Sequence, residues 1–212
     1  MTAHRLVIWR HGRTTWNRTG RFQGQADIAL DELGEVQAKA AAPALAAMAP
    51  GRIVASDLIR AQQTAAQLAE QTGLPVSADP RLREIHVGSW EGLTADEVAR
   101  IDPERARKYL AGEDVRRSAT GETVGEVADR VAEALTEVAE QADDGETVVV
   151  VMHGLAARVG ACRLVGLPQD HWRLLASVNN CAWISLTRHH RSGYWQIEGY
   201  NVTGGPTTAD PV

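Results

Sequence analysis

Two histidines stand directly behind long apolar runs, and their positions favour chemistry on an anion. His11 follows the run Leu6–Trp9 after one intervening residue, Arg10, and His153 follows the run Thr147–Met152. A continuous apolar run is typical of a strand buried on both faces, and ligands of open α/β sheets bind beyond the carboxyl ends of such strands. A neutral imidazole can act as a covalent nucleophile, and a guanidinium matches the shape of a phosphate. The sequence therefore predicts a nucleophile and an anion clamp at one edge of a sheet.

The elements that must position these residues follow an α/β pattern. Six segments have the composition of strands: Leu6–Trp9, Ile53–Ala55, Val76–Ala78, Val148–Met152, Ala182–Leu186 and Trp195–Glu198. The first four alternate with helix-like segments, which favours parallel pairing. The last two are joined by a turn-rich stretch, which indicates an antiparallel hairpin. We expect a three-layer α/β/α fold with a mostly parallel central sheet and one antiparallel edge.

Several helices carry end signals in the sequence. Asp31 is placed to cap a helix that contains Pro43, and an interior proline costs about 3 kcal/mol, so we expect a kink or two shorter helices there. Thr123 and Glu126 have the spacing of a capping box at the start of another helix. A further helix is expected to begin directly after His153.

The whole chain, residues 1–212, is expected to form one domain. Residues 86–122 contain prolines, glycines and many charges, and we interpret them as an irregular small lobe inserted over the site. The segment from about 204 to 212 is polar and contains two prolines, so it is expected to be a loose tail.

Composition narrows the function classes. The chain has 212 residues, 44% of them hydrophobic, and a formal net charge of −5, which argues against general nucleic-acid binding. We find neither a signal peptide nor an apolar stretch of membrane-spanning length, and so expect no membrane partner. Cys162 and Cys181 have no metal or redox spacing, which favours the cytoplasm and reduced thiols. The oligomeric state stays open between a monomer and a homodimer.

The two histidines belong to a longer series of short motifs. The series consists of Arg10–Thr14 with Trp16-Asn17, Phe22-Gln23-Gly24, Ser56–Ala61 with Gln63–Ala65, Leu82–Ile85 with Gly88–Gly92, Gly121–Thr123, and His153-Gly154. In residue type and order these motifs resemble those of the histidine phosphatase superfamily, which also includes cofactor-dependent phosphoglycerate mutases. The resemblance covers most of the chain and is specific because all the motifs occur together.

The resemblance implies a role for each matching residue. His11 would be the nucleophile that forms a phosphohistidine, and Glu84 would protonate the leaving alkoxide and then help to activate water. Neither a metal nor a cofactor would be needed. The residues that grip the phosphoryl oxygens or complete the pocket would be Arg10, Arg60, His153, Asn17, Gln23 and the backbone N–H of Gly154.

The same residues make chemical sense without the resemblance. Phosphoryl transfer depends mainly on positioning and on stabilising charge on the equatorial oxygens, which two guanidiniums and a second imidazole can supply. Gly154 is expected to start a helix, and the free N–H groups of a helix N-terminus favour an anion. A carboxylic acid such as Glu84 can supply the proton that an alkoxide leaving group requires.

Hydrolysis is favoured over the mutase reaction. Only residues 93–122 separate the Gly92 motif from Thr123, whereas mutases of this family carry a longer insertion there. The segments Gln23–Gln25 and Val178–Asn180 resemble family members that act on glucosyl-3-phosphoglycerate. The expected substrate is thus a small phosphorylated metabolite, a sugar phosphate or a phosphoglycerate derivative. The alternatives are a phosphoglycerate mutase, an α-ribazole phosphatase, and a non-enzymatic phospho-ligand sensor.

A few residues keep two interpretations. Arg116 and Arg117 form either a solvated patch or a site for a second anionic group of the substrate. Thr123 is a helix cap with ligand contact as a second option. Trp90 either packs in the core or lines the pocket.

Overall fold

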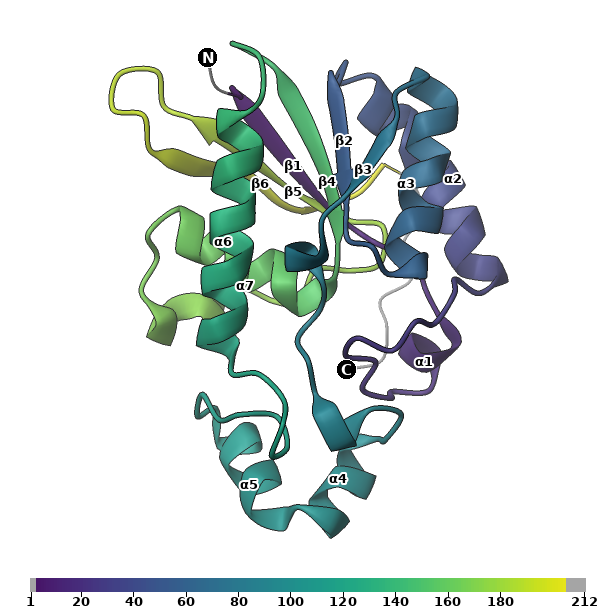
Figure 1. Cartoon of the computed structure of the whole chain (residues 1–212), viewed down its shortest axis with the longest axis vertical. Coiled ribbons are helices and arrows are strands. Elements are labelled where there is room, and N and C mark those ends of the chain that lie inside the picture. The colour runs from purple at the N-terminus through teal and green to yellow at the C-terminus, as the bar shows by residue number, and fades with distance from the viewer. Residues whose placement is uncertain (1–2, 205–212) are drawn as a thin grey trace.

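The computed structural model describes residues 3–204, and a single six-stranded sheet forms its centre (Figure 1). The strands are β1 (Arg5–Arg10), β2 (Arg52–Ala55), β3 (Val76–Ala78), β4 (Thr147–Met152), β5 (Trp183–Arg188) and β6 (Trp195–Val202). Their order in the sheet is β3-β2-β4-β1-β5-β6. The first four pair in parallel, whereas β5 is antiparallel to β1 and β6 to β5. The predicted mostly parallel sheet with an antiparallel edge is confirmed.

Helices cover both faces of the sheet, which gives the three predicted layers (Figure 1). The helices are α1 (Thr15–Arg18), α2 (Glu32–Ala46), α3 (Ile59–Thr72), α4 (Ala95–Ile101), α5 (Pro103–Ala111), α6 (Val124–Glu140) and α7 (Gly154–Leu164). Three short 3₁₀ helices are η1 (Pro80–Leu82), η2 (Gly88–Trp90) and η3 (Gln169–Leu174). One buried cluster joins the sheet to α6 and α7, and a second joins it to α2 and α3. Among the described residues, no helix has both the length and the apolar character needed to cross a membrane.

The helix-start signals behave as predicted. The Asp31 side chain accepts from Gly34 N at the start of α2, and Thr123 and Glu126 form a complete capping box at the start of α6. The expectation at Pro43 was wrong, because α2 runs without interruption from Glu32 to Ala46. Pro43 lies in the last turn of α2, where one missing N–H removes a single bond close to the helix end.

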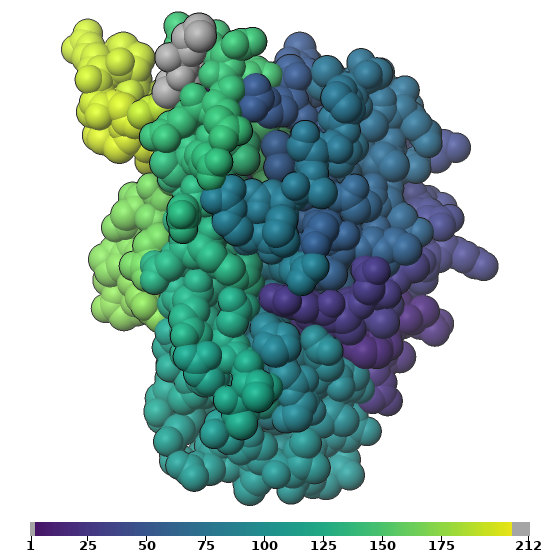
Figure 2. Space-filling view, viewed as in Figure 1, coloured from purple at the N-terminus to yellow at the C-terminus, as the bar shows by residue number. Residues whose placement is uncertain are grey.

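The interpretation of residues 86–122 as irregular was also wrong. This segment contains η2, α4 and α5, and it forms the lower end of the molecule, in contact with the N-terminal segment around α1 (Figures 1 and 2). Pro103 is the first residue of α5, a position where the missing N–H would be unpaired in any case. Gly112 ends α5 in the left-handed conformation with φ 92°, which glycine adopts easily. Most of the expected tail, residues 205–212, lies outside the described residues.

Candidate active site

Sheet register brings the two histidines together. Arg10 and Met152 are partners in the parallel ladder of β1 and β4, and His11 and His153 are the residues that directly follow these two strands. Their ring centroids are 5.1 Å apart. Both side chains are buried, and burial together with the nearby Arg60 cation lowers the pKa of each ring well below its ordinary value. Both imidazoles are therefore neutral at physiological pH.

Hydrogen bonds fix the tautomer of His11. Its Nδ1 lies 2.7 Å from the carbonyl oxygen of Gly12. Because a carbonyl can only accept, Nδ1 carries the proton and Nε2 keeps its lone pair. The backbone is held as well, since Asn180 Nδ2 donates to the His11 carbonyl at 3.0 Å and His11 N donates to Met152 O at 3.0 Å. A neutral, oriented imidazole with a free Nε2 is the form that nucleophilic attack requires.

Arg60 lies in the first turn of α3 and is fully buried. Its Nε donates to His153 Nδ1 at 3.2 Å, and its terminal nitrogens donate to the carbonyls of Ala26 and Gly24 at 2.7 and 2.9 Å. Burial lowers the pKa of Arg60 to about 10, so the guanidinium stays charged at neutral pH. Because His153 Nδ1 accepts, Nε2 carries the ring proton and donates to Ser56 Oγ at 2.9 Å.

Arg10 approaches the first turn of α7. Its Nη1 donates to Val178 O at 2.6 Å. A Cβ atom at Gly154 would lie 3.1 Å from Arg10 Nε, closer than side chains normally pack. Glycine at the first position of α7 therefore lets the Arg10 guanidinium lie against the start of the helix.

Glu84 occupies the N-terminus of α7. Its carboxylate accepts hydrogen bonds from the backbone N–H groups of Ile85, Leu155 and Ala156 at 2.9, 3.1 and 3.1 Å. Unpaired N–H groups and the helix dipole make this position favourable for an anion. We predicted that this helix end would favour an anion, and in the structure two of its N–H groups donate to the Glu84 carboxylate.

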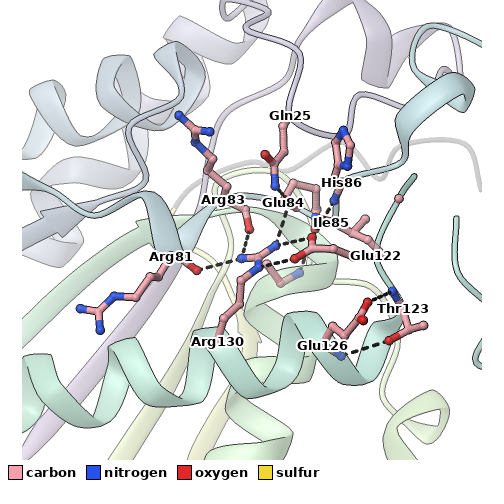
Figure 3. Close-up of polar contacts among 12 residues, drawn as sticks. Gln25, Arg81, Arg83, Glu84, Ile85, His86, Glu122, Thr123, Glu126 and Arg130 are labelled. Carbon is pink, nitrogen blue, oxygen red and sulfur yellow. Dashed lines mark hydrogen bonds and ion pairs between the residues drawn. The ribbon is translucent and has the colours of Figure 1, made fainter. Parts of the chain in front are cut away.

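A single arginine on α6 holds the backbone that carries Glu84 (Figure 3). Arg130 uses all five of its N–H donors. Two go to the carboxylate of Glu122 at 2.8 and 2.8 Å, and three go to the carbonyls of Arg81, Arg83 and Glu84 at 2.8, 2.7 and 3.0 Å. We call Arg130 and Glu122 the loop clamp. No motif in the sequence analysis pointed to Arg130.

The loop clamp is extended by two further contacts (Figure 3). Glu122 Oε2 also accepts from His86 N at 2.8 Å, and Gln25 Nε2 donates to the Glu84 carbonyl at 3.2 Å. Burial alone would raise the pKa of Glu122, but the Arg130 guanidinium and the His86 N–H outweigh it, so the pKa is lowered. Glu122 is therefore a stable counterion for Arg130, and Glu84 is fixed through both its backbone and its side chain.

Most of the predicted site residues line one cavity of ≈ 220 Å³, here called the phosphate cavity. Those residues are Arg10, His11, Asn17, Gln23, Arg60 and Glu84. Asn17 Oδ1 accepts from Thr14 N at 3.1 Å, and Gln23 Oε1 accepts from Thr14 Oγ1 at 2.9 Å. Because the two amide oxygens are used within the protein, Asn17 and Gln23 have their NH₂ groups to offer an anion.

Some residues depart from the expectations. Trp90 is fully buried and does not line the phosphate cavity, but it packs against Phe22 and Tyr109, which do. Arg116 points away to Glu126 and Gly121, whereas Arg117 is buried and lines the phosphate cavity. Across residues 3–204, no cluster of three or more His, Cys, Asp or Glu side chains is arranged to hold a metal ion.

Comparison with known proteins identifies the family of the chain. The model of the histidine phosphatase superfamily (branch 1) matches residues 6–203. The chain belongs to this family. This histidine phosphatase is 44% identical to a glucosyl-3-phosphoglycerate phosphatase of Mycolicibacterium vanbaalenii, with 96% of each chain covered. It is 36% identical to a metal-independent phosphoserine phosphatase of Arabidopsis thaliana, with 92% of this chain and 80% of that protein covered.

Solved structures show the same fold. A mycobacterial glucosyl-3-phosphoglycerate phosphatase in complex with VO3 superimposes with a TM-score of 0.86 at 38% identity, covering 94% of this chain and 100% of that chain. The predicted fold class and family are thus confirmed, and this histidine phosphatase is a hydrolase of phosphate monoesters.

Proposed function

We propose that this protein hydrolyses a phosphoglycerate-type phosphate monoester, with glucosyl-3-phosphoglycerate as the expected substrate, through a phosphohistidine at His11. The observation that carries the proposal is the neutral His11, whose Nε2 keeps its lone pair on the wall of a cavity that Arg10 and Arg60 also line. The names of the two relatives and of the solved structure support the substrate class. We propose that the enzyme works in the cytoplasm, where its two buried free cysteines would stay reduced.

The proposed reaction has two transfers. In the first, His11 Nε2 attacks phosphorus, the bond from phosphorus to the ester oxygen breaks, and Glu84 in its acid form gives its proton to the leaving alkoxide. In the second, Glu84 takes a proton from water, whose oxygen attacks phosphorus, and the bond from phosphorus to Nε2 breaks to release phosphate. Arg10 and Arg60 stabilise the charge on the transferring group in both steps.

Glu84 has to change partners in this scheme. In the structure its carboxylate accepts from Leu155 N and Ala156 N. A phosphate dianion in the phosphate cavity places a like charge beside this carboxylate, and a proton taken up by Glu84 relieves the repulsion. The vacated N–H groups at the start of α7 can then bind a phosphate oxygen.

The structure also favours a substrate with a second anionic group. Arg117 is 3% exposed, and its guanidinium lies 4.5 Å from the ring centroid of Tyr109. In the described part of the chain no carboxylate forms a direct ion pair with it, and Asp114 acts on it only through space, so a buried positive charge lines the phosphate cavity. The carboxylate of a phosphoglycerate would neutralise this charge.

Trapping the intermediate tests the mechanism. Purified enzyme is mixed briefly with ³²P-labelled substrate in the presence of a chelator and quenched without acid. A base-stable, acid-labile label on His11 and release of phosphate are the expected results. His11→Ala should show neither, while His4→Ala, at an exposed histidine outside the site, should retain both.

A substrate panel separates the alternatives. It contains glucosyl-3-phosphoglycerate, 3-phosphoglycerate, phosphoserine, α-ribazole phosphate and p-nitrophenyl phosphate. Conversion of 3-phosphoglycerate to its 2-isomer without phosphate release would establish the mutase reaction instead. Binding of the esters without turnover of any of them would establish a sensor, and a strict requirement for a divalent metal would contradict the charge assignment to Arg10 and Arg60.

A further inference from the structure

A second and larger cavity lies beside the phosphate cavity. It has a volume of ≈ 790 Å³ and is bounded by the end of α5, the start of α6, α7 and η3. We call it the distal cavity. Three residues, Tyr109, Arg117 and Leu155, line both cavities, so the two spaces are adjacent and these side chains lie between them. A ligand bound at His11 can therefore extend past them without crossing the core.

The boundary between the cavities is cationic. Arg117 is almost completely buried. Among the described residues it contacts the ring of Tyr109 and donates one hydrogen bond from Nη1 to Val115 O at 2.7 Å. A guanidinium has five N–H donors, so several remain for a ligand. Burial lowers the pKa of Arg117 without making it neutral at physiological pH, because an arginine titrates far above it.

The wall of the distal cavity is rich in hydrogen-bonding groups from several elements. Arg158 on α7 donates from Nη1 to Leu175 O at 3.2 Å, and its Nε is buried without a hydrogen-bond partner among the described residues. Asp114 Oδ2 accepts from Gln169 Nε2 at 2.7 Å, which ties η3 to the segment after α5. Arg173 and Ser177 add further hydrogen-bonding groups to the wall.

The lining also includes apolar side chains such as Leu110, Val159 and Trp172, so the wall suits both the hydroxyl groups and the apolar ring face of a sugar. Carboxylates and the Gln169 amide oxygen accept from hydroxyls, and the guanidiniums of Arg158 and Arg173 donate to them. The cavity volumes also indicate that a larger ligand needs the distal cavity. Small-molecule sites typically measure about 300–1,000 Å³, and the phosphate cavity at ≈ 220 Å³ falls below that range. The distal cavity at ≈ 790 Å³ falls within it.

We propose that the distal cavity is the subsite for a sugar-sized, hydroxyl-rich extension of the leaving group, attached beyond the part of the substrate that Arg117 contacts. This proposal rests on the proposed phosphatase activity at His11. It predicts that the distal cavity selects glycosylated phosphoglycerates over the simple ester, whereas the phosphoryl chemistry is the same for both.

Filling the cavity tests the proposal. Ser177→Trp places a large ring in the distal cavity, and Leu174→Trp is the matched control, because Leu174 is 79% exposed and lines neither cavity. For each variant we compare kcat/KM for glucosyl-3-phosphoglycerate with kcat/KM for 3-phosphoglycerate. The ratio should exceed one in the wild type, fall at least about tenfold in Ser177→Trp and stay unchanged in Leu174→Trp.

The readouts separate the possible failures. Val178, the neighbour of Ser177, accepts from Arg10, so turnover of p-nitrophenyl phosphate reports whether the phosphate cavity itself is disturbed. If Ser177→Trp does not fold, Gln169→Leu replaces it and should raise KM for the glucosyl ester alone. Absence of turnover of every ester by the wild type would refute the proposed function. Turnover with an unchanged ratio in the folded variant would refute the distal subsite alone. A wild-type ratio of one or less would refute the subsite together with the expected preference for glucosyl-3-phosphoglycerate, and would leave the phosphatase activity standing.

Discussion

Replacing Arg130 by methionine should separate catalysis from substrate binding. The change keeps an apolar stem of similar length but removes the five hydrogen bonds that join α6 to Glu122 and to the carbonyls of Arg81, Arg83 and Glu84. Breaking a buried ion pair from one side costs about 3–5 kcal/mol. The side chains of Arg130 and Glu122 are 20% and 22% exposed, so we expect a loss near the lower end, about 2–4 kcal/mol of unfolding free energy.

The kinetic effect should be larger on kcat than on KM. Without the loop clamp, Glu84 can shift, and a displacement of about 1 Å at a reacting group can reduce the rate by roughly 10²-fold. Arg10 and Arg60 do not contact the clamp, so phosphate binding should change little. The loss should also be greater for an alkyl ester, which needs the proton from Glu84, than for p-nitrophenyl phosphate.

Two measurements check these expectations. Urea unfolding gives the change in free energy, and Arg5→Met serves as the control because the ion pair of Arg5 with Glu198 is 33% and 51% exposed and should contribute less than about 1 kcal/mol. Kinetics are then compared under conditions where all variants are folded. Equal losses of kcat for alkyl and aryl esters would show that Arg130 does not act through Glu84, and a normal kcat would refute the positioning role.

Two further predictions concern titratable groups. Glu84→Gln should slow single-turnover phosphorylation by an alkyl ester about 10²–10⁴-fold and by a nitrophenyl ester far less; similar losses on both would leave Glu84 a structural role. In the folded protein the pKa values of His11 and His153 lie well below the ordinary value of 6.5, which applies in the unfolded chain. Below pH 6.5 the unfolded chain therefore binds more protons than the folded protein. The unfolding free energy should fall as the pH decreases from 6.5 toward the folded pKa values. Each histidine contributes up to about 1.4 kcal/mol per pH unit to the slope of unfolding free energy against pH. His11→Gln should therefore reduce this slope, measured by urea unfolding at a series of pH values, by about that amount. An unchanged slope would contradict the burial of a neutral ring.

The sequence predicted the parts of the fold that depend on local patterns. Apolar runs and capping residues such as Asp31 and Thr123 act within a few residues, and the structure has the corresponding strands and helix starts. The errors at Pro43 and in residues 86–122 concern the place of a proline within a helix. A proline at the first position of a helix or in its last turn is tolerated, but the composition of the segment alone does not show which position it takes.

The candidate site was predictable only where a motif marks it. His11 and Arg60 stand in short, specific motifs, whereas Arg130 contacts residues 46 to 49 positions away in the sequence. The sequence contains only a weak indication of the role of Arg130. Glu122 lies just before the N-cap of α6, and Arg130 follows it by 8 residues, about two helical turns along α6. The distal cavity had no signal at all, because it forms between α5, α7 and η3 only after the chain has folded.

The ladder between β1 and β4 has a consequence for how substrate preference can change. The two histidines are attached to neighbouring strands at the same level of the sheet, so their separation is set by main-chain hydrogen bonds in the core. The walls of the distal cavity, in contrast, come from α5, the start of α6, α7 and η3. Insertions or substitutions in α5 and η3 can therefore reshape leaving-group recognition while the distance between His11 and His153 stays constant. Exchanging those two segments between relatives offers a direct route to new substrate preferences while the catalytic centre stays unchanged.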